Sequence, residues 1–223
     1  MTISIPDQFN EKRWSPTKKK NQSACPMLNT LSNYKLLPKK NITTKSINIA
    51  LQKSNLFDDS IFLILTNIFN YNFNGYIKNI INIGKHGIIE HDVSLTRIDN
   101  NNGNSNHFNK KRFKKMLSFS KDNIHLTLEE LAQYYIYQKK CSKKNNSNSN
   151  YGLNEMISSL AEIISLVALL KDDTNRIRLD WLKEFFTKEK LPFKKGYILK
   201  QINIYDFISI CIKFVSLTIK YTI

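Results

Sequence analysis

Hydrophobic residues along this chain recur mainly at helical spacing, and few stretches alternate apolar and polar positions as strands do. Residues 60–73 carry Ile61, Leu65, Ile68 and Phe69 at helical spacing. Residues 156–170 are apolar at 11 of 15 positions, with Glu162 as the one ionisable side chain. Because only 6 glycines also occur among 223 residues, the pattern predicts an all-α fold.

Capping residues mark where two of these helices should begin. Residues 41–46 supply Asn and Thr side chains that can cap a helix starting before Ile47. Thr127 and Glu130 have the three-residue spacing of a capping box. The apolar stretch 204–217 is interrupted by charged residues, so we expect a packed terminal helix and no membrane span, which needs about 20 apolar residues.

The chain shows no internal repeat and no clear domain boundary. Residues 1–23 are polar and basic and are expected to form an N-terminal arm. Residues 24–215 then form one helical domain. Asn- and Lys-rich segments near 100–106 and 142–150 are expected as surface loops.

Composition adds a net charge of +16, from 34 basic and 18 acidic residues, which in isolation favours an anionic partner. The basic residues are spread from end to end, so we expect no nucleic-acid partner. Pro6 and Asp7 interrupt the N-terminus before an apolar segment develops, so no classical signal peptide is expected, and an intracellular or non-classically exported protein is favoured. Three cysteines argue against a disulfide framework.

The first candidate for chemistry is Cys25, which directly precedes Pro26. Proline is favoured at the first helical position, so Cys25 should lie at or near the helix N-cap. There, unpaired amide N–H groups and the helix dipole stabilise a thiolate, the form of cysteine that binds metals or attacks electrophiles. The alternative is a buried, inert cysteine beside a turn proline.

The second candidate is the segment 90–94, in which Glu90, His91, Asp92 and Ser94 bring two carboxylates, an imidazole and a hydroxyl together. Oxygen ligands of this kind suit Mg²⁺, and an aspartate beside a histidine can fix the orientation of its ring. The alternative is a solvated charged loop between two helices.

The third candidate is Glu162. If its helix is packed, desolvation should raise the pKa of this carboxyl and make it a proton shuttle near neutral pH. The alternative is that Glu162 lies on a narrow polar stripe with Ser158, Ser159 and Ser165 and faces water.

Together these sites and their flanking residues resemble the haem-thiolate peroxidases, the family of fungal chloroperoxidase and the unspecific peroxygenases. The resemblance extends over about residues 13–210 in a consistent order with compatible gaps. Its matching stretches are CPMLNTLSN (25–33), LP (37–38), EHDVSLTRID (90–99), FN (108–109), LTLEELA (126–132), Glu162 ten residues before Asp172, RLDWLKEFF (178–186) and KLPF (190–193).

This resemblance implies a chloroperoxidase-like, single helical domain of the short type that encloses haem b. Cys25 would be the axial ligand of the haem iron, and Glu162 the acid–base residue for peroxide, oriented by His91, which Asp92 holds in turn. The resemblance also implies a magnesium (or manganese) ion beside a haem propionate. Its ligands would be the Glu90 carboxylate, the His91 backbone carbonyl and the Ser94 hydroxyl.

The function implied is the use of hydrogen peroxide to oxidise, halogenate or oxygenate small organic molecules. The alternatives are a catalytically degenerate haem-binding relative and a basic, non-enzymatic anion-binding protein. Two departures from the family pattern stand near the ligand cysteine. Ala24 replaces a proline, and Tyr34-Lys35 replaces a His-Gly pair whose glycine provides an easy left-handed helix end.

Overall fold

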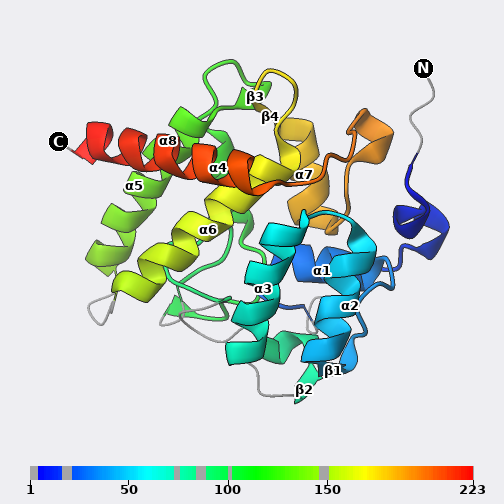
Figure 1. Cartoon of the computed structure of the whole chain (residues 1–223). Coiled ribbons are helices and arrows are strands. Elements are labelled where there is room, and N and C mark those ends of the chain that lie inside the picture. Colours follow the sequence, from blue (N-terminus) through cyan, green and yellow to red (C-terminus); the bar gives the residue numbers. More distant parts are fainter. Residues whose placement is uncertain are drawn as a thin grey trace.

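The computed structural model of the chain describes residues 5–16, 22–72, 76–83, 89–99, 102–145 and 151–222. These residues form eight α-helices and four short strands, which confirms the all-α prediction (Figure 1). The helices are α1 Pro26–Asn33, α2 Thr44–Ser54, α3 Asp59–Asn72, α4 Lys110–Leu117, α5 Leu128–Asn145, α6 Leu153–Leu170, α7 Leu179–Lys188 and α8 Ile204–Thr222.

Both predicted capping signals start helices. Thr43 is the N-cap of α2, where its hydroxyl accepts from the Ser46 amide at 3.0 Å and the Ser46 hydroxyl accepts from the Thr43 amide at 2.9 Å. At the start of α5, the Thr127 hydroxyl accepts from the Glu130 amide at 3.1 Å and the Glu130 carboxylate accepts from the Thr127 amide at 2.8 Å. Each box satisfies helix-end amides that have no partner within the helix.

The strands pair as two small antiparallel ribbons. β1 (Lys40–Thr43) pairs with β2 (Tyr76–Asn79), with Ile42 opposite Ile77. β3 (His125–Leu126) pairs with β4 (Ile177–Arg178), with Leu126 opposite Ile177. Because β3 leads into α5 and β4 leads into α7, the second ribbon holds the beginnings of these two helices together.

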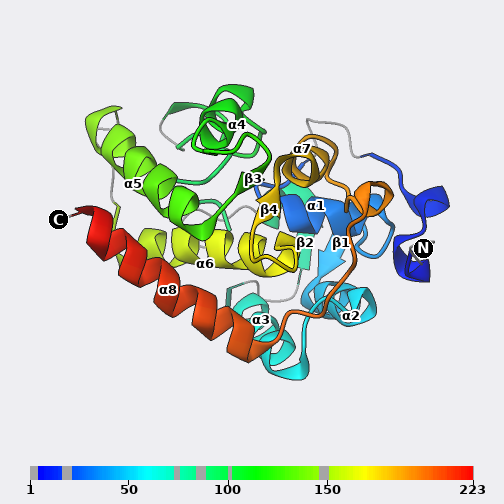
Figure 2. The ribbon, with the colours of Figure 1, turned by 90° about the horizontal axis from the view of Figure 1, so that it is seen from above.

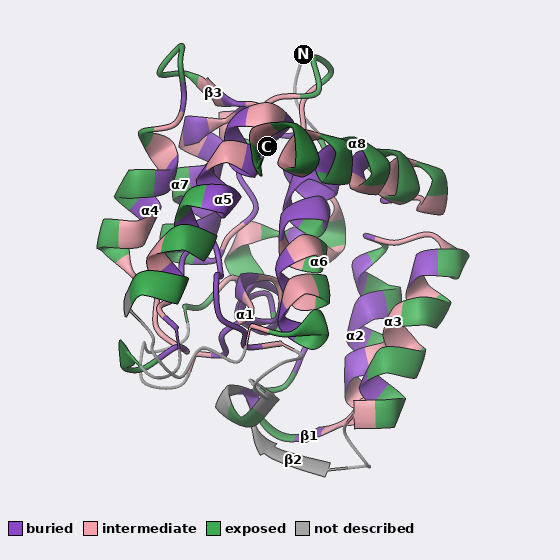
Figure 3. Cartoon of the chain, turned by 90° about the vertical axis from the view of Figure 1, so that its left-hand side faces the viewer, coloured by how far each residue is buried: buried purple, intermediate pink, exposed green. Residues whose placement is uncertain are grey.

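Helix α6 crosses the middle of the molecule and contributes its C-terminal half to the core (Figures 1 and 3). α8 packs across α5 and α6 (Figure 2). Among the described helices, α6 is the one long and apolar enough to cross a membrane, but half of its residues are buried inside the protein. Both the apolar sequence of α6 and its burial are those of a core helix in a folded protein.

Parts of the expected N-terminal arm and of the expected loops belong to the folded domain. Phe9 is fully buried, with its ring 5.2 Å from that of Tyr34. α8 continues to Thr222, beyond the expected end of the domain at 215. α5 also runs through Asn145, into the segment expected as a loop, and Ser142 in this last part of the helix is buried. Residues 100–101 and 146–150 of the expected loops lie outside the described residues.

Candidate functional site

Cys25 is the N-cap residue of α1, and Pro26 is the first residue of the helix, as the sequence predicts. The cysteine is half-buried and packs against the core. Burial raises the pKa of the Cys25 thiol, and the backbone amides of Met27 and Leu28 oppose that rise. The helix N-terminus therefore supplies amide dipoles that favour a thiolate in a site with little water.

The loop that carries Cys25 is tied to the rest of the protein by buried side chains. Asn29 forms a pair of hydrogen bonds with the backbone of Ser23, both 2.8 Å long. The Nε of Arg97 donates to the carbonyl oxygen of Ala24 at 3.1 Å. Arg97 also forms an ion pair with Glu189, in which Nη2 lies 3.5 Å from Oε1. These contacts fix the backbone on the N-terminal side of the cysteine.

The segment 90–97 is buried and is not a solvated loop. Glu90, His91, Asp92 and Ser94 are between 3% and 5% exposed. Val93 takes a left-handed conformation, with φ of 63°, which a valine rarely adopts. Its amide donates to the Asp99 carboxylate at 3.2 Å, a contact that holds this turn of the backbone.

Glu162 on α6 points toward this segment. Its Oε1 accepts from the Ser94 hydroxyl at 3.0 Å, and its Oε2 accepts from the Leu95 amide at 2.9 Å. The side chain is 17% exposed. Glu162 therefore does not face open water, whereas Ser165, one turn further along α6, is exposed.

His91 lies between Glu162 and the backbone of its own segment. Its Nε2 is 3.6 Å from Oε2 of Glu162, and its Nδ1 is 3.0 Å from the backbone carbonyl oxygen of Asp92. Because a carbonyl only accepts, Nδ1 carries the proton in that bond. The expected contact of Asp92 with the imidazole thus runs through the backbone carbonyl. The Ser159 hydroxyl, 3.3 Å from Nδ1, also donates to this carbonyl at 3.2 Å.

Cys25, Arg97 and Glu162 lie close enough for their charges to interact. The negative charge of Glu162 raises the pKa of the Cys25 thiol, while the positive charge of Arg97 lowers it. Burial lowers the pKa of Arg97, and Glu189, Glu162 and Cys25 all oppose that change. The fold thus places the Cys25 thiol and the Glu162 carboxylate of α6 within electrostatic range of one another.

Three buried charged residues at this site escaped the sequence analysis: Arg97, Glu155 and Glu189. The carboxylate of Glu155 accepts from the Asp92 amide at 2.9 Å and so holds the backbone next to His91 in place. Arg97 belongs to the 90–99 motif, but nothing in that motif shows that its side chain is 2% exposed. Glu189 lies in a lysine-rich stretch, where a carboxylate normally indicates a solvated surface.

The expected magnesium ligands are of mixed kind, one carboxylate, one backbone carbonyl and one hydroxyl. The part of the chain that the structure describes holds no group of three or more His, Cys, Asp or Glu side chains suited to a metal. Of the expected ligands at Glu90, His91 and Ser94, only the Glu90 carboxylate is a side chain of these types, so this absence does not bear on them. The hydroxyl of Ser94 donates its proton to Glu162, which leaves the lone pairs of its oxygen available to a cation.

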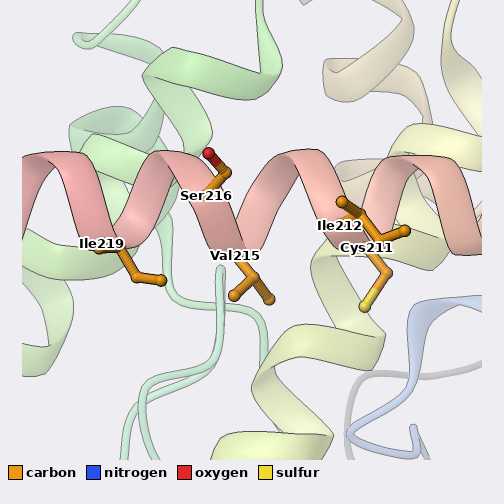
Figure 4. A pocket seen from close by; sticks show the side chains of 5 residues that line it. All are labelled: Cys211, Ile212, Val215, Ser216 and Ile219. Atoms are coloured by element: carbon orange, nitrogen blue, oxygen red, sulfur yellow. The ribbon is translucent and has the colours of Figure 1, made fainter.

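A separate hollow of about 400 Å³ lies along α8 and is lined by Cys211, Ile212, Val215, Ser216 and Ile219 (Figure 4). Its lining holds no carboxylate, imidazole or amine. A neighbouring hollow, also on α8, adds Tyr205 and Lys213. The five residues that line the first hollow thus include no acid–base side chain, which makes it a weaker candidate for chemistry than the Cys25 site.

The family described as "Peroxidase, family 2" matches residues 11–202 of this chain. The matched range includes Cys25, the segment 90–97 and Glu162, and it ends just before α8. The chain has no match among the curated proteins.

Proposed function

This chain belongs to peroxidase family 2, and from that membership we propose that it is a haem-thiolate peroxidase in which Cys25 is the axial ligand of the iron. The observation that supports the proposal is that the Glu162 carboxylate lies near enough to Cys25 to raise the pKa of its thiol, while Nε2 of His91 lies 3.6 Å from Oε2 of Glu162. A thiolate site and a proton-transfer site then lie within reach of one another, although 137 positions separate Cys25 from Glu162 in the numbering.

The residues at this site suit haem b. A helix-cap cysteine supplies the soft anionic ligand that haem-thiolate iron requires. Nη1 of Arg97 is buried and has no hydrogen-bond partner among the described residues, so the site has a donor available for an added acceptor. The haem, when bound, would supply the two electrons that reduce the O–O bond of the peroxide, one from the iron and one from the porphyrin.

Glu162 is proposed as the residue that moves the proton. Its carboxylate accepts a proton from one oxygen of hydrogen peroxide and returns it to the other oxygen, which leaves as water. General acid–base help of this kind accelerates reactions by about 10²–10⁴-fold. The Ser94 hydroxyl and the Leu95 amide hold both carboxylate oxygens, so Glu162 is oriented before the peroxide arrives.

His91 is proposed to hold Glu162 in place and to share its proton. Since Nδ1 donates to the Asp92 carbonyl, Nε2 is the nitrogen that faces Oε2 of Glu162. A single proton between these two atoms makes the contact attractive, whereas two lone pairs would repel. The pair can therefore store the proton between its removal from one oxygen and its delivery to the other.

A magnesium ion, or manganese in its place, is proposed at Glu90, the His91 carbonyl and Ser94. Hard oxygen ligands of this kind are the ones these cations prefer. Because Ser94 also donates to Glu162, a cation at this position is coupled to the acid–base residue through one hydroxyl. Such a cation would also compensate the negative charge that haem propionates bring.

We propose hydrogen peroxide as the oxidant and small organic molecules as the substrates, which are oxidised, halogenated or oxygenated. The experiment that tests the proposal is a spectrum of the haem-loaded protein, reduced under carbon monoxide. We expect the red-shifted Soret band of thiolate ligation in the wild type and in Cys211→Ala, a matched control in which another half-buried cysteine is removed. The same band in Cys25→Ala, or its absence from the wild type, contradicts the assignment of the ligand.

A further inference from the structure

Behind the Cys25 loop lies a buried group of polar side chains, which we call the Glu189 cluster: Gln22, Asn29, Arg97 and Glu189. Asn29, Arg97 and Glu189 are 0%, 2% and 1% exposed. They come from α1, from the segment after Ser94 and from the end of α7, so only the folded chain brings them together. The proposed proton transfer uses none of them.

The contacts of this cluster converge on the residues just before Cys25. Asn29 donates to the Ser23 carbonyl, and Arg97 donates to the Ala24 carbonyl. Glu189 in turn accepts from Gln22 and from Asn29, each at 2.7 Å. The two carbonyls that precede Cys25 therefore depend on donors that Glu189 holds in place.

Glu189 has a backbone conformation that is unfavourable for a glutamate, which indicates that its side chain has a structural role. It ends α7 with φ of 51°, a left-handed conformation that glycine or asparagine adopts at lower cost. Its backbone carbonyl also accepts from the side-chain amide of Asn33 at 3.2 Å. A glycine at this position would end the helix equally well, but it would remove the carboxylate that faces Arg97.

The charges of the cluster act at short range in a medium of low dielectric, where salt and water screen them little. Arg97 carries a permanent positive charge, and Glu189 is its only carboxylate partner within salt-bridge distance in the described parts of the chain. A positive charge near the iron favours the ferrous state, which carries one positive charge less than the ferric state. A negative charge favours the ferric state.

We infer that Arg97 and Glu189 form a charge-balanced pair that positions the Cys25 loop and sets the reduction potential of the iron bound there. This inference rests on the proposed function, because it needs a thiolate-ligated haem. Both are positioning residues, since they act through the backbone and the electric field and touch neither peroxide nor substrate.

The test measures the ferric–ferrous reduction potential of the haem-loaded protein at pH 8 by spectroelectrochemistry. In Glu189→Gln the amide keeps an oxygen for Asn29, but Arg97 loses its counter-charge, so we expect the potential to rise. In the double variant Arg97→Gln/Glu189→Gln the local charge is again neutral, so we expect the potential to return toward the wild-type value. Arg176→Gln, which removes an exposed arginine that pairs with Asp122, should leave the potential unchanged.

An unchanged or lower potential in Glu189→Gln overturns the inference, whether or not the double variant folds. A double variant that departs further from the wild type than the single variant also overturns it, since that pattern reports damage to the loop and not charge balance. Arg97→Lys keeps the charge but loses the planar fork, so it should keep the potential and retain haem less well.

The same samples separate failure of the inference from failure of the proposed function. If the wild type lacks the thiolate Soret band, the proposed function fails before any potential is compared. If the wild type shows the band, Cys25→Ala abolishes it and Glu189→Gln leaves the potential unchanged, the function stands and the role of the Glu189 cluster is wrong.

Discussion

Glu162 has the same sequence neighbours whether its helix turns it toward water or toward the protein. The fold decides what its two oxygens contact, which are the Ser94 hydroxyl and the Leu95 amide. The same holds for Glu189, whose lysine-rich neighbours indicate a surface position although the residue is buried. At this scale, sequence identifies the chemical group, and the structure decides what the group can touch.

Replacing Glu162 by glutamine should leave haem binding intact and slow peroxide turnover by about 10²–10⁴-fold, because an amide cannot take the proton of the peroxide. Rapid-mixing measurements of peroxide consumption give the rate, and the carbon monoxide spectrum reports the haem. Glu129→Gln, a carboxylate change on α5 that lies outside the site, serves as the control. Equal turnover in Glu162→Gln and in the wild type would assign the proton transfer to another residue.

Glu189 should make the folding stability depend on pH. Burial raises its pKa from the usual value near 4.5 to about 7, although Arg97, Asn29 and Gln22 oppose the rise. The folded state therefore holds a proton that the unfolded state releases between these pH values. Its contribution to the free energy of unfolding is complete below about pH 4.5 and is lost as the pH rises to about 7, a change of roughly 3 kcal/mol.

Urea unfolding at pH 5 and pH 8 checks this dependence. The drop in the free energy of unfolding between the two pH values should be larger in the wild type than in Glu189→Gln, where the group no longer titrates. Other titrating groups contribute equally to both proteins and cancel in the comparison. An equal drop in the two proteins would mean that Glu189 does not hold its proton more tightly in the folded state.

Among the elements, helix starts were better determined by sequence than helix ends. Thr43, Thr127 and the Cys25–Pro26 pair act through neighbours within three positions, so local sequence carries the whole signal. The end of α1 is different. Lys35 takes a left-handed conformation, with φ of 62°, where a glycine would be expected, and the Leu36 amide donates to the Leu31 carbonyl at 2.9 Å to close the helix.

Lys35→Gly should therefore stabilise the protein by roughly 0.5–1 kcal/mol, because the strain of a left-handed lysine exceeds the extra entropy that glycine loses on folding. Urea unfolding measures the difference. Lys140→Gly, at an exposed position inside α5, is the matched control and should destabilise by about 1 kcal/mol. A loss of stability in both variants would show that Lys35 is not strained.

Thr127→Ala should destabilise the protein by about 1 kcal/mol, because it removes the acceptor of the Glu130 amide at the start of α5. Thr127→Ser keeps a hydroxyl at the same place and should retain most of the stability. Thermal unfolding of the two variants side by side checks the prediction. If both lose the same amount, the methyl group of the threonine, and not the cap, explains the loss.

Across the whole molecule, α8 is the element that least resembles a core helix. Ile210 and Phe214 are buried, whereas Ile208, Ile212 and Ile219 are exposed. It lies beyond the range matched by peroxidase family 2 and packs across α5 and α6. An apolar sequence predicts a packed helix here, but it does not reveal that one side remains uncovered.

Phe214→Ala should destabilise the fold by about 3–5 kcal/mol, since its ring is fully buried and lies 5.7 Å from that of Tyr135. Ile212→Ala, on the exposed side of the same helix, should change stability by less than about 0.5 kcal/mol. The free energy of unfolding in urea distinguishes the two. Similar small effects from both substitutions would mean that α8 adds little to the cooperative core.

The sequence by itself determined the helical fold, the helix starts, the position of Cys25 at a helix cap and membership in a peroxidase family, because these depend on local spacing or on the order of motifs. Only the tertiary structure decided which charged residues are buried. Arg97, Glu155 and Glu189 look like surface residues in sequence, since burial depends on distant segments that cover them and supply their hydrogen bonds. The tertiary structure also decided the surroundings of Cys25. No local pattern specifies the contacts between α1, α6, α7 and the segment 90–97.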